Sequence, residues 1–161
     1  MIWKHILTII AIVLFAGCTA TIHHSPAASF QNSSEAKEII KQVMLEQPGE
    51  MAPVNVEVTD QFIKIHLIKT DQMYGYNIPW CKFVHFSNIG KIEIKQKRPD
   101  SQQWFVVSVM DKDNKLKCDI YTLHESKARG FADALYTLQA NKMSGNKDKN
   151  EKVSSYYRKA G

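Results

Sequence analysis

The sequence lacks the motifs by which common hydrolases and nucleotide-binding enzymes are recognised. Its 161 residues contain no G-x-S-x-G, no H-E-x-x-H and no glycine-rich phosphate loop, and its seven glycines are scattered. His66, His85 and His124 have no local partner that would make one of them a base for a nucleophile. We therefore expect no enzyme, no catalytic residue and no cofactor.

Metal-binding patterns are missing as well. Neutral imidazole suits Zn or Cu, but His23 and His24 have no nearby cysteine or carboxylate to complete a ligand set. Asp111, Asp113 and Asn114 form a short polar run, yet the glycine and the distal glutamate of an EF-hand loop are absent. The run predicts a hairpin turn, and no metal site is expected.

No hydrophobic run is long enough to span a bilayer. The run from Ile6 to Phe15 has about half of the roughly 20 apolar residues that a membrane-spanning helix needs. Lys4 precedes it and small residues follow it, which is typical of a secretory signal. The stretch FAGC at residues 15–18 resembles the lipobox of bacterial lipoproteins, although Phe15 stands where the family usually has an aliphatic residue.

The resemblance implies that residues 1–17 are a signal peptide and that Cys18 becomes the lipidated first residue of the mature chain. Two or three acyl chains hold a protein firmly on a membrane, whereas one chain holds it marginally. Thr19 stands where an aspartate would favour the inner membrane in enterobacterial lipoproteins. The implied location is the outer membrane, facing the periplasm; an ordinary signal peptide or an uncleaved anchor are the alternatives.

Cysteine is scarce, and with Cys18 lipidated only Cys81 and Cys118 remain. Disulfides persist in exported proteins, so a disulfide between these two thiols is one interpretation. The other is that both are small buried hydrophobic residues on separated strands. The sequence leaves both interpretations open.

Both ends of the mature chain lack a core-forming pattern. Residues 18–32 show no apolar periodicity and predict a flexible tether. Residues 144–161 predict a disordered basic tail, because the chain has six basic and only two acidic residues from Asn141 onward. The formal net charge of the chain is +5, so positive charge is concentrated in this tail rather than on the domain. That distribution argues against nucleic acid, and it suits either a solvated end or contact with anionic lipids or cell-wall polymers.

Residues 33–143 form one domain of ordinary size that begins and ends with a predicted helix. The first helix has Ser33 and Ser34 as its N-cap and stops at Gln47-Pro48-Gly49. The second follows the capping-box spacing from Thr122 to Glu125. Its apolar face is predicted to contain Ala128, Phe131, Ala132, Leu135 and Leu138.

Short alternating segments between the helices predict about seven antiparallel strands. They are VNVEV, FIKIHLI, MYGYNI, WCKFVHF, IGKIEIKQ, WFVVSVM and LKCDIYTL. With no helix between them, they are expected to curl into a small barrel or sandwich whose open end the C-terminal helix caps. The predicted fold class is α+β.

This order resembles the pleckstrin-homology-like fold. The phrases IPWCKFVHFSNIGKIEI and HESKARGFADALYTL are similar to its bacterial members, although the first helix is not part of the minimal fold. A generic α+β lipoprotein domain is the alternative. We expect a non-enzymatic binding or assembly module of the cell envelope with a protein or peptide partner and no nucleic acid; the alternative function is a small envelope hydrolase that uses dispersed His and acidic residues.

Overall fold

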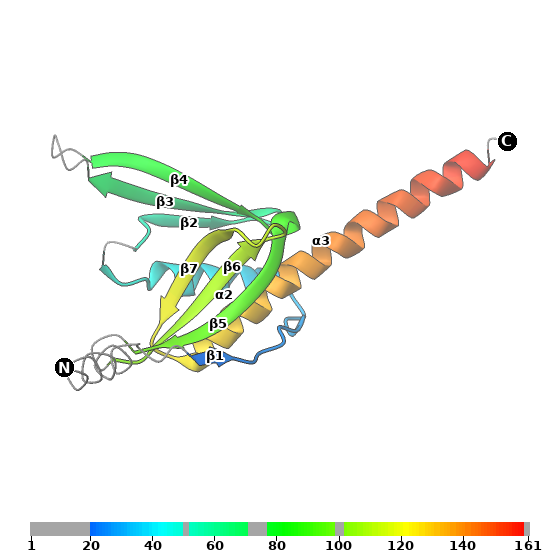
Figure 1. Cartoon of the computed structure of the whole chain (residues 1–161). Coiled ribbons are helices and arrows are strands. Elements are labelled where there is room, and N and C mark those ends of the chain that lie inside the picture. The colour runs from blue at the N-terminus through cyan, green and yellow to red at the C-terminus, as the bar shows by residue number, and fades with distance from the viewer. Residues whose placement is uncertain (1–19, 50–51, 71–76, 99–101, 160–161) are drawn as a thin grey trace, which may run out of the picture.

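The computed structural model describes residues 20–49, 52–70, 77–98 and 102–159 (Figure 1). Within these residues the fold is α+β, with two α-helices and seven antiparallel strands in two sheets, which confirms the predicted class. The elements are β1 (Ala20–Ile22), α2 (Ser33–Leu45), β2 (Asn55–Val58), β3 (Phe62–Thr70), β4 (Asn77–His85), the 3-10 helix η2 (Phe86–Asn88), β5 (Ile89–Lys97), β6 (Trp104–Asp111), β7 (Leu116–Thr122) and α3 (Glu125–Lys159).

The two sheets have the strand orders β1-β5-β6-β7 and β2-β3-β4. The chain passes from one to the other through η2, and β4 and β5 diverge from there like the arms of a V (Figure 1). The described strands therefore do not close into a barrel, and that part of the prediction is wrong. Closure is not needed to bury the apolar faces, because residues of α2, α3 and both sheets share one hydrophobic core.

Both helices begin and bury residues largely as the sequence predicted. The N-cap of α2 is Asn32 rather than the serines, and its side-chain oxygen accepts a hydrogen bond from the Ser34 N–H at 2.9 Å. The predicted apolar face of α3 is buried throughout. The helices run antiparallel, with the Lys127 ammonium at the start of α3 2.6 Å from the Glu46 carboxylate at the end of α2.

Helix α3 continues past the domain to Lys159, over residues for which the sequence predicted a disordered basic tail from residue 144 onward (Figure 1). A helix already formed on the core extends without a new nucleation cost. At 1.5 Å per residue, the 35 residues of α3 span about 50 Å.

Residues 20–32, which we expected to be part of a flexible tether, lie on the domain. Strand β1 pairs with β5, with Ala20 opposite Gln96. Backbone pairing needs no apolar pattern, so composition alone did not reveal it. The strand count agrees with the prediction only because two differences cancel. The prediction missed β1, and it divided β4 into two strands, since part of MYGYNI and most of WCKFVHF form β4. Residues 73–76 of MYGYNI lie outside the described part.

Cys18 and the lipobox-like stretch also lie outside the described residues. Among the helices of the described part, none is both long and apolar enough to cross a membrane.

Candidate functional site: a groove between the two sheets

A groove of about 300 Å³ lies where the two sheets begin to diverge, between β3 and the outer edge of β7. The end of α2 and Pro53 close one side of it. It is lined mainly by apolar residues, namely Met44, Pro53, Ile65, Leu67, Ile68, Cys118 and Ile120, together with Gln47, Lys69, Lys82 and Asp119.

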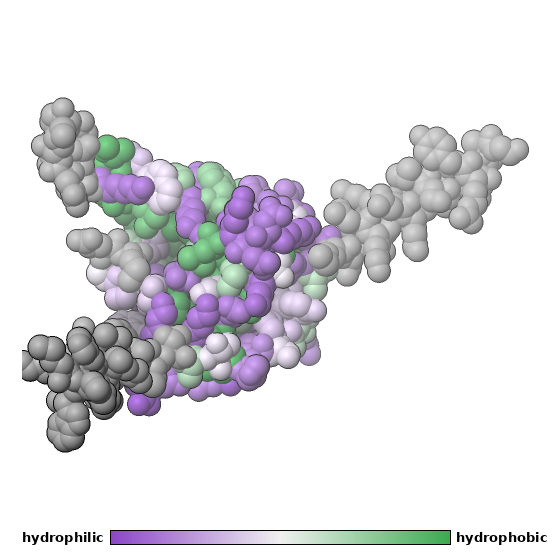
Figure 2. Space-filling view, viewed as in Figure 1, coloured by the Kyte–Doolittle hydropathy of each residue, from purple (hydrophilic) through white to green (hydrophobic). Residues whose placement is uncertain are grey.

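The groove arises because the inner face of the β3–β4 arm loses its cover towards its tip. Ile65 is buried, Leu67 is half-buried, and Trp80, which is opposite Leu67 in the register, is 39% exposed. Ile78, on the same face and nearer the tip, is 43% exposed. Figure 2 shows apolar residues at the surface along this arm. An apolar strip therefore leads from the core through the groove to solvent.

The outer edge of β7 forms one wall and presents backbone hydrogen-bonding groups. At Tyr121 these groups are already bonded to the Gln47 side chain. Backbone direction alternates along an antiparallel strand, so the N–H and C=O of Asp119, two residues earlier, also point away from β6. Asp119 lines the groove, and its carboxylate accepts a hydrogen bond from the Ser108 hydroxyl at 2.6 Å. The wall can therefore pair with an extended chain at Asp119.

The charged side chains that the β3–β4 arm contributes to the groove, Lys69 and Lys82, are basic. Lys82 is opposite Ile65 in the register, so it lies on the inner face of the arm. The Lys69 ammonium lies 4.1 Å from the centre of the Trp80 ring, a cation–π contact at the rim. An occupant with apolar side chains and a carboxylate would match this lining.

The two described cysteines are free and lie in different sheets, so the disulfide that the sequence left open is not formed. Cys118 lies in the groove wall, and burial raises the pKa of its thiol to about 12. A thiol with this pKa stays protonated at neutral pH and is a poor nucleophile. Cys81 is exposed on the opposite face of the β3–β4 arm, where its Sγ lies 3.5 Å from Nδ1 of His66.

The predicted candidate histidines do not meet in the groove. His66 and His85 lie on the outer face of the β3–β4 arm, where the His85 ring stacks on Phe83 with the ring centres 6.3 Å apart. His124 is exposed beside the start of α3. Among the residues that the structure describes, no group of three or more His, Cys, Asp or Glu side chains is placed to hold a metal ion.

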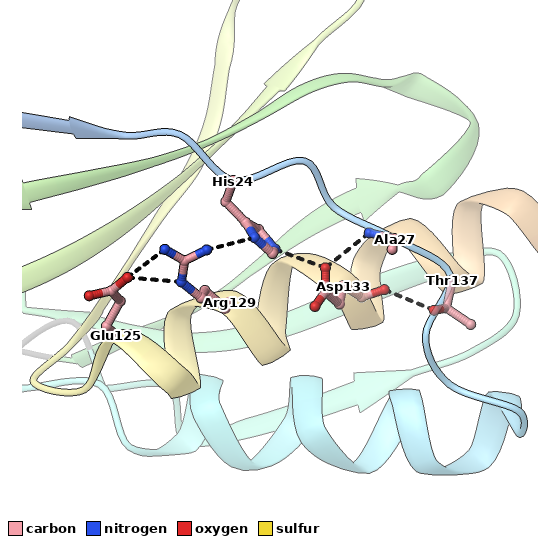
Figure 3. A network of polar contacts seen from close by, with 6 residues as sticks. All are labelled: His24, Ala27, Glu125, Arg129, Asp133 and Thr137. Carbon is pink, nitrogen blue, oxygen red and sulfur yellow. Dashed lines mark hydrogen bonds and ion pairs between the residues drawn. The ribbon is translucent and has the colours of Figure 1, made fainter.

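His24 joins a polar network that fastens the N-terminal segment to α3 (Figure 3). The Asp133 carboxylate lies 2.8 Å from Nε2 of His24 and accepts the Ala27 N–H at 3.0 Å. Arg129 donates to Nδ1 of His24 at 3.0 Å and to Glu125 at 2.6 Å. A guanidinium can only donate, so Nδ1 accepts and Nε2 carries the proton towards Asp133. This network holds residues 20–32 in place.

Sequence reasoning missed the groove, although the sequence held a signal for it. Ile78 and Trp80 lie on the inward face of β4, but they lie near its start, where Asn77 and Pro79 are their neighbours and the opposite sheet no longer covers them.

Compared with protein-family models, with curated proteins and with solved structures, the chain matches none of them.

Proposed function

We propose that this protein is a non-enzymatic binding module of the bacterial cell envelope, held through a lipid on Cys18 at the periplasmic face of the outer membrane. The lipobox-like stretch at residues 15–18 supports the anchor. The observation that carries the binding role is the apolar groove beside Asp119, whose backbone N–H and C=O point away from β6 at the edge of the sheet. An extended segment of an envelope protein is the occupant that fits both features.

The proposed segment pairs with the edge of β7 at Asp119 as an added strand. Its alternate side chains enter the groove over Ile65 and Leu67, because side chains of a strand point to opposite faces in turn. Lys69 and Lys82 attract an acidic side chain of that segment. Main-chain pairing supplies affinity in this mode, and the apolar and basic positions supply specificity.

We also propose that the domain is a variant of the pleckstrin-homology-like fold. Support comes from the order of six strands between α2 and a C-terminal helix. The departure is the gap between β7 and the β3–β4 arm, which is the groove itself.

Site-specific photo-cross-linking in intact cells tests the binding role. A photoreactive residue replaces Leu67, which lines the groove and whose side chain lies on the inner face of the β3–β4 arm with Ile65 and Lys82. The control position is Lys112, exposed in the turn between β6 and β7. We expect one dominant protein adduct from position 67 and none of that size from position 112. Lys69→Glu combined with Lys82→Glu should weaken the adduct, and the absence of any adduct at position 67 would overturn the proposal.

Replacement of the anchor cysteine tests the lipid separately. Cys18→Ser should abolish labelling by radioactive fatty acid and release the protein from the membrane fraction, because no thiol remains to be acylated at that position. Equal label on the variant would contradict the lipoprotein assignment.

A small envelope hydrolase is the second candidate, and the contact between Cys81 and His66 favours it. A separation of 3.5 Å allows an imidazole to take a proton from a thiol. The pair is exposed on a sheet face, away from the groove. Hydrolysis of a fluorogenic ester by the purified protein, lost in both Cys81→Ser and His66→Gln, would establish this candidate in place of the first.

A further inference from the structure

Strand β1 begins two residues after the proposed lipid anchor and lies near a cluster of basic and aromatic side chains. Only Thr19 separates Cys18 from Ala20, so the chain can place Cys18 no more than about 7 Å from Ala20. Ala20 is fixed opposite Gln96 near the end of β5. The contacts of His24 and Ala27 with Asp133 hold the following segment on α3. A lipid on Cys18 is therefore tied closely to one end of the four-stranded sheet.

The cluster, which we call the β5-end patch, consists of four side chains on the outer face of this sheet and of Arg98, which directly follows β5; the four are Lys95, Lys97, Trp104 and Tyr121. Lys97 is opposite Trp104 in the register, and its ammonium lies 5.9 Å from the centre of the Tyr121 ring. The Trp104 and Tyr121 rings meet edge to face with centres 6.4 Å apart. Neighbouring strands lie about 4.8 Å apart, so Trp104, two strands from Ala20, is about 10 Å from it across the sheet.

The charges of the patch are available to a ligand. Lys95 contacts Glu93 at 3.1 Å. Lys97 and Arg98, in contrast, have no carboxylate partner among the residues that the structure describes. The nearest polar contact of Arg98 is the Gln103 side chain at 3.4 Å. Within the described residues, Lys97 is therefore a cation without a carboxylate partner beside the Tyr121 ring, and Arg98 directly follows it in the chain.

We infer that the β5-end patch rests on phospholipid headgroups and fixes how the anchored domain lies on its membrane. The inference rests on the proposed lipid at Cys18. Tryptophan and tyrosine favour the headgroup region, where an apolar ring meets lipid and a polar N–H or O–H meets water. Lysine and arginine are attracted to the phosphates of anionic lipids. The acyl chains supply attachment, and the patch supplies orientation.

Tryptophan fluorescence can test the inference on the full-length lipidated protein, reconstituted in vesicles of phosphatidylethanolamine and phosphatidylglycerol that carry bromine near the headgroup. The chain has three tryptophans, and Trp3 lies in the segment that the signal peptide removes. Trp80→Phe leaves Trp104 as the reporter of the patch. Trp104→Phe leaves Trp80, on the β3–β4 arm, as the comparison.

We expect bromine to quench Trp104 several-fold more strongly than Trp80. Lys97→Glu combined with Arg98→Glu should reduce the quenching of Trp104 several-fold. The control pair is Lys112→Glu with Lys115→Glu, which makes the same charge change in the turn at the other end of the same sheet, and quenching should be unchanged. Trp104 emission that bromine does not quench, or an equal effect of the two pairs, would overturn the inference.

Fatty-acid labelling of the same preparations shows whether the proposed lipid anchor or only the proposed orientation is wrong. Protein without label would contradict the proposed lipid anchor. Labelled protein whose Trp104 is not quenched would leave the anchor standing and overturn only the orientation.

Discussion

The side-chain amide of Gln47 pairs with the backbone of Tyr121 as a neighbouring strand would. Its Nε2 donates to the Tyr121 carbonyl at 3.0 Å, and its Oε1 accepts the Tyr121 N–H at 2.8 Å. The same Nε2 also donates to the Val43 carbonyl at 2.9 Å. One side chain therefore joins the last turn of α2 to the edge of β7 and blocks that part of the edge against other strands.

Gln47→Leu should destabilise the protein by about 1–3 kcal/mol, because it leaves the Tyr121 N–H and C=O in a largely buried place without partners. Gln42→Leu is the matched control, since the Gln42 side chain is exposed and contacts only Glu46. Chemical denaturation measures both variants. Equal loss of stability in the two would mean that the pairing contributes nothing beyond an ordinary surface contact.

Gly90→Ala should destabilise by about 1–3 kcal/mol, because a Cβ at this position would lie 2.6 Å from both the Asp111 carbonyl oxygen and the Lys112 Cα. Backbone atoms cannot move aside as the end of a long side chain can. Gly130→Ala provides the contrast, since nothing lies within 4 Å of its added Cβ and alanine favours a helix by up to about 1 kcal/mol. Thermal melting should move in opposite directions for the two variants.

Asp111→Asn should destabilise the protein at neutral pH and have little effect in acid. The Lys117 ammonium at 2.7 Å, assisted by the backbone N–H groups of Lys115 and Asp113, holds the pKa of Asp111 below its usual range. A lowered pKa stabilises the fold above the pKa of the unfolded carboxyl, about 3.9, and the effect is lost as the pH falls through the folded-state pKa.

The stability difference between wild type and Asp111→Asn should therefore be full at pH 7 and shrink below about pH 4. Asp113→Asn, in the same turn, is the control and should show a small difference throughout. Urea denaturation across this pH range measures both. A difference that stays constant in acid would mean that the Asp111 charge does not stabilise the turn.

Asp133→Ala should release the N-terminal segment from α3 while the domain stays folded. The carboxylate holds both His24 and Ala27, and hydrogen bonds to a charged group are worth about 1.5–3 kcal/mol. Amide exchange in Ala20–Ile22 should accelerate roughly 10- to 100-fold. Glu125→Ala, which removes only a contact of Arg129, should accelerate it much less. Unchanged exchange in Asp133→Ala would mean that β1 is held by its pairing with β5 alone.

Much of the fold could be predicted because the local patterns were strong. In β3, Ile63 and Ile65 alternate with Lys64 and His66, and the structure buries the two isoleucines as that period requires. Helix α3 likewise buries Phe131 on the predicted face. The spacing of apolar residues along a segment shows which side chains face a core. It therefore identifies strands and helices even when the segments that pack against them are unknown.

The features that could not be predicted depend on contacts between distant residues. Strand β1 has three residues and no apolar pattern, and only its partner Gln96 on β5 makes it a strand. The groove depends on how far the sheets diverge, which no local period records. The separation of Cys81 from Cys118 follows from the division of the strands between two sheets. Tertiary contacts decided each of these outcomes.

The V formed by β4 and β5 has a mechanical consequence. Its apex, η2, is held to both sheets, since the Phe86 N–H donates to Gln61 beside β3 and the Lys112 N–H donates to Asn88. Phe86 itself is fully buried, which makes the apex a firm pivot. Each arm has nine residues and is about 30 Å long, so a rotation of about 10° at the pivot moves the tip by about 5 Å. The width of the gap between the two arms therefore depends on the angular stiffness of the three residues of η2. A substitution in η2 would change which widths of ligand fit, although η2 does not contact the ligand.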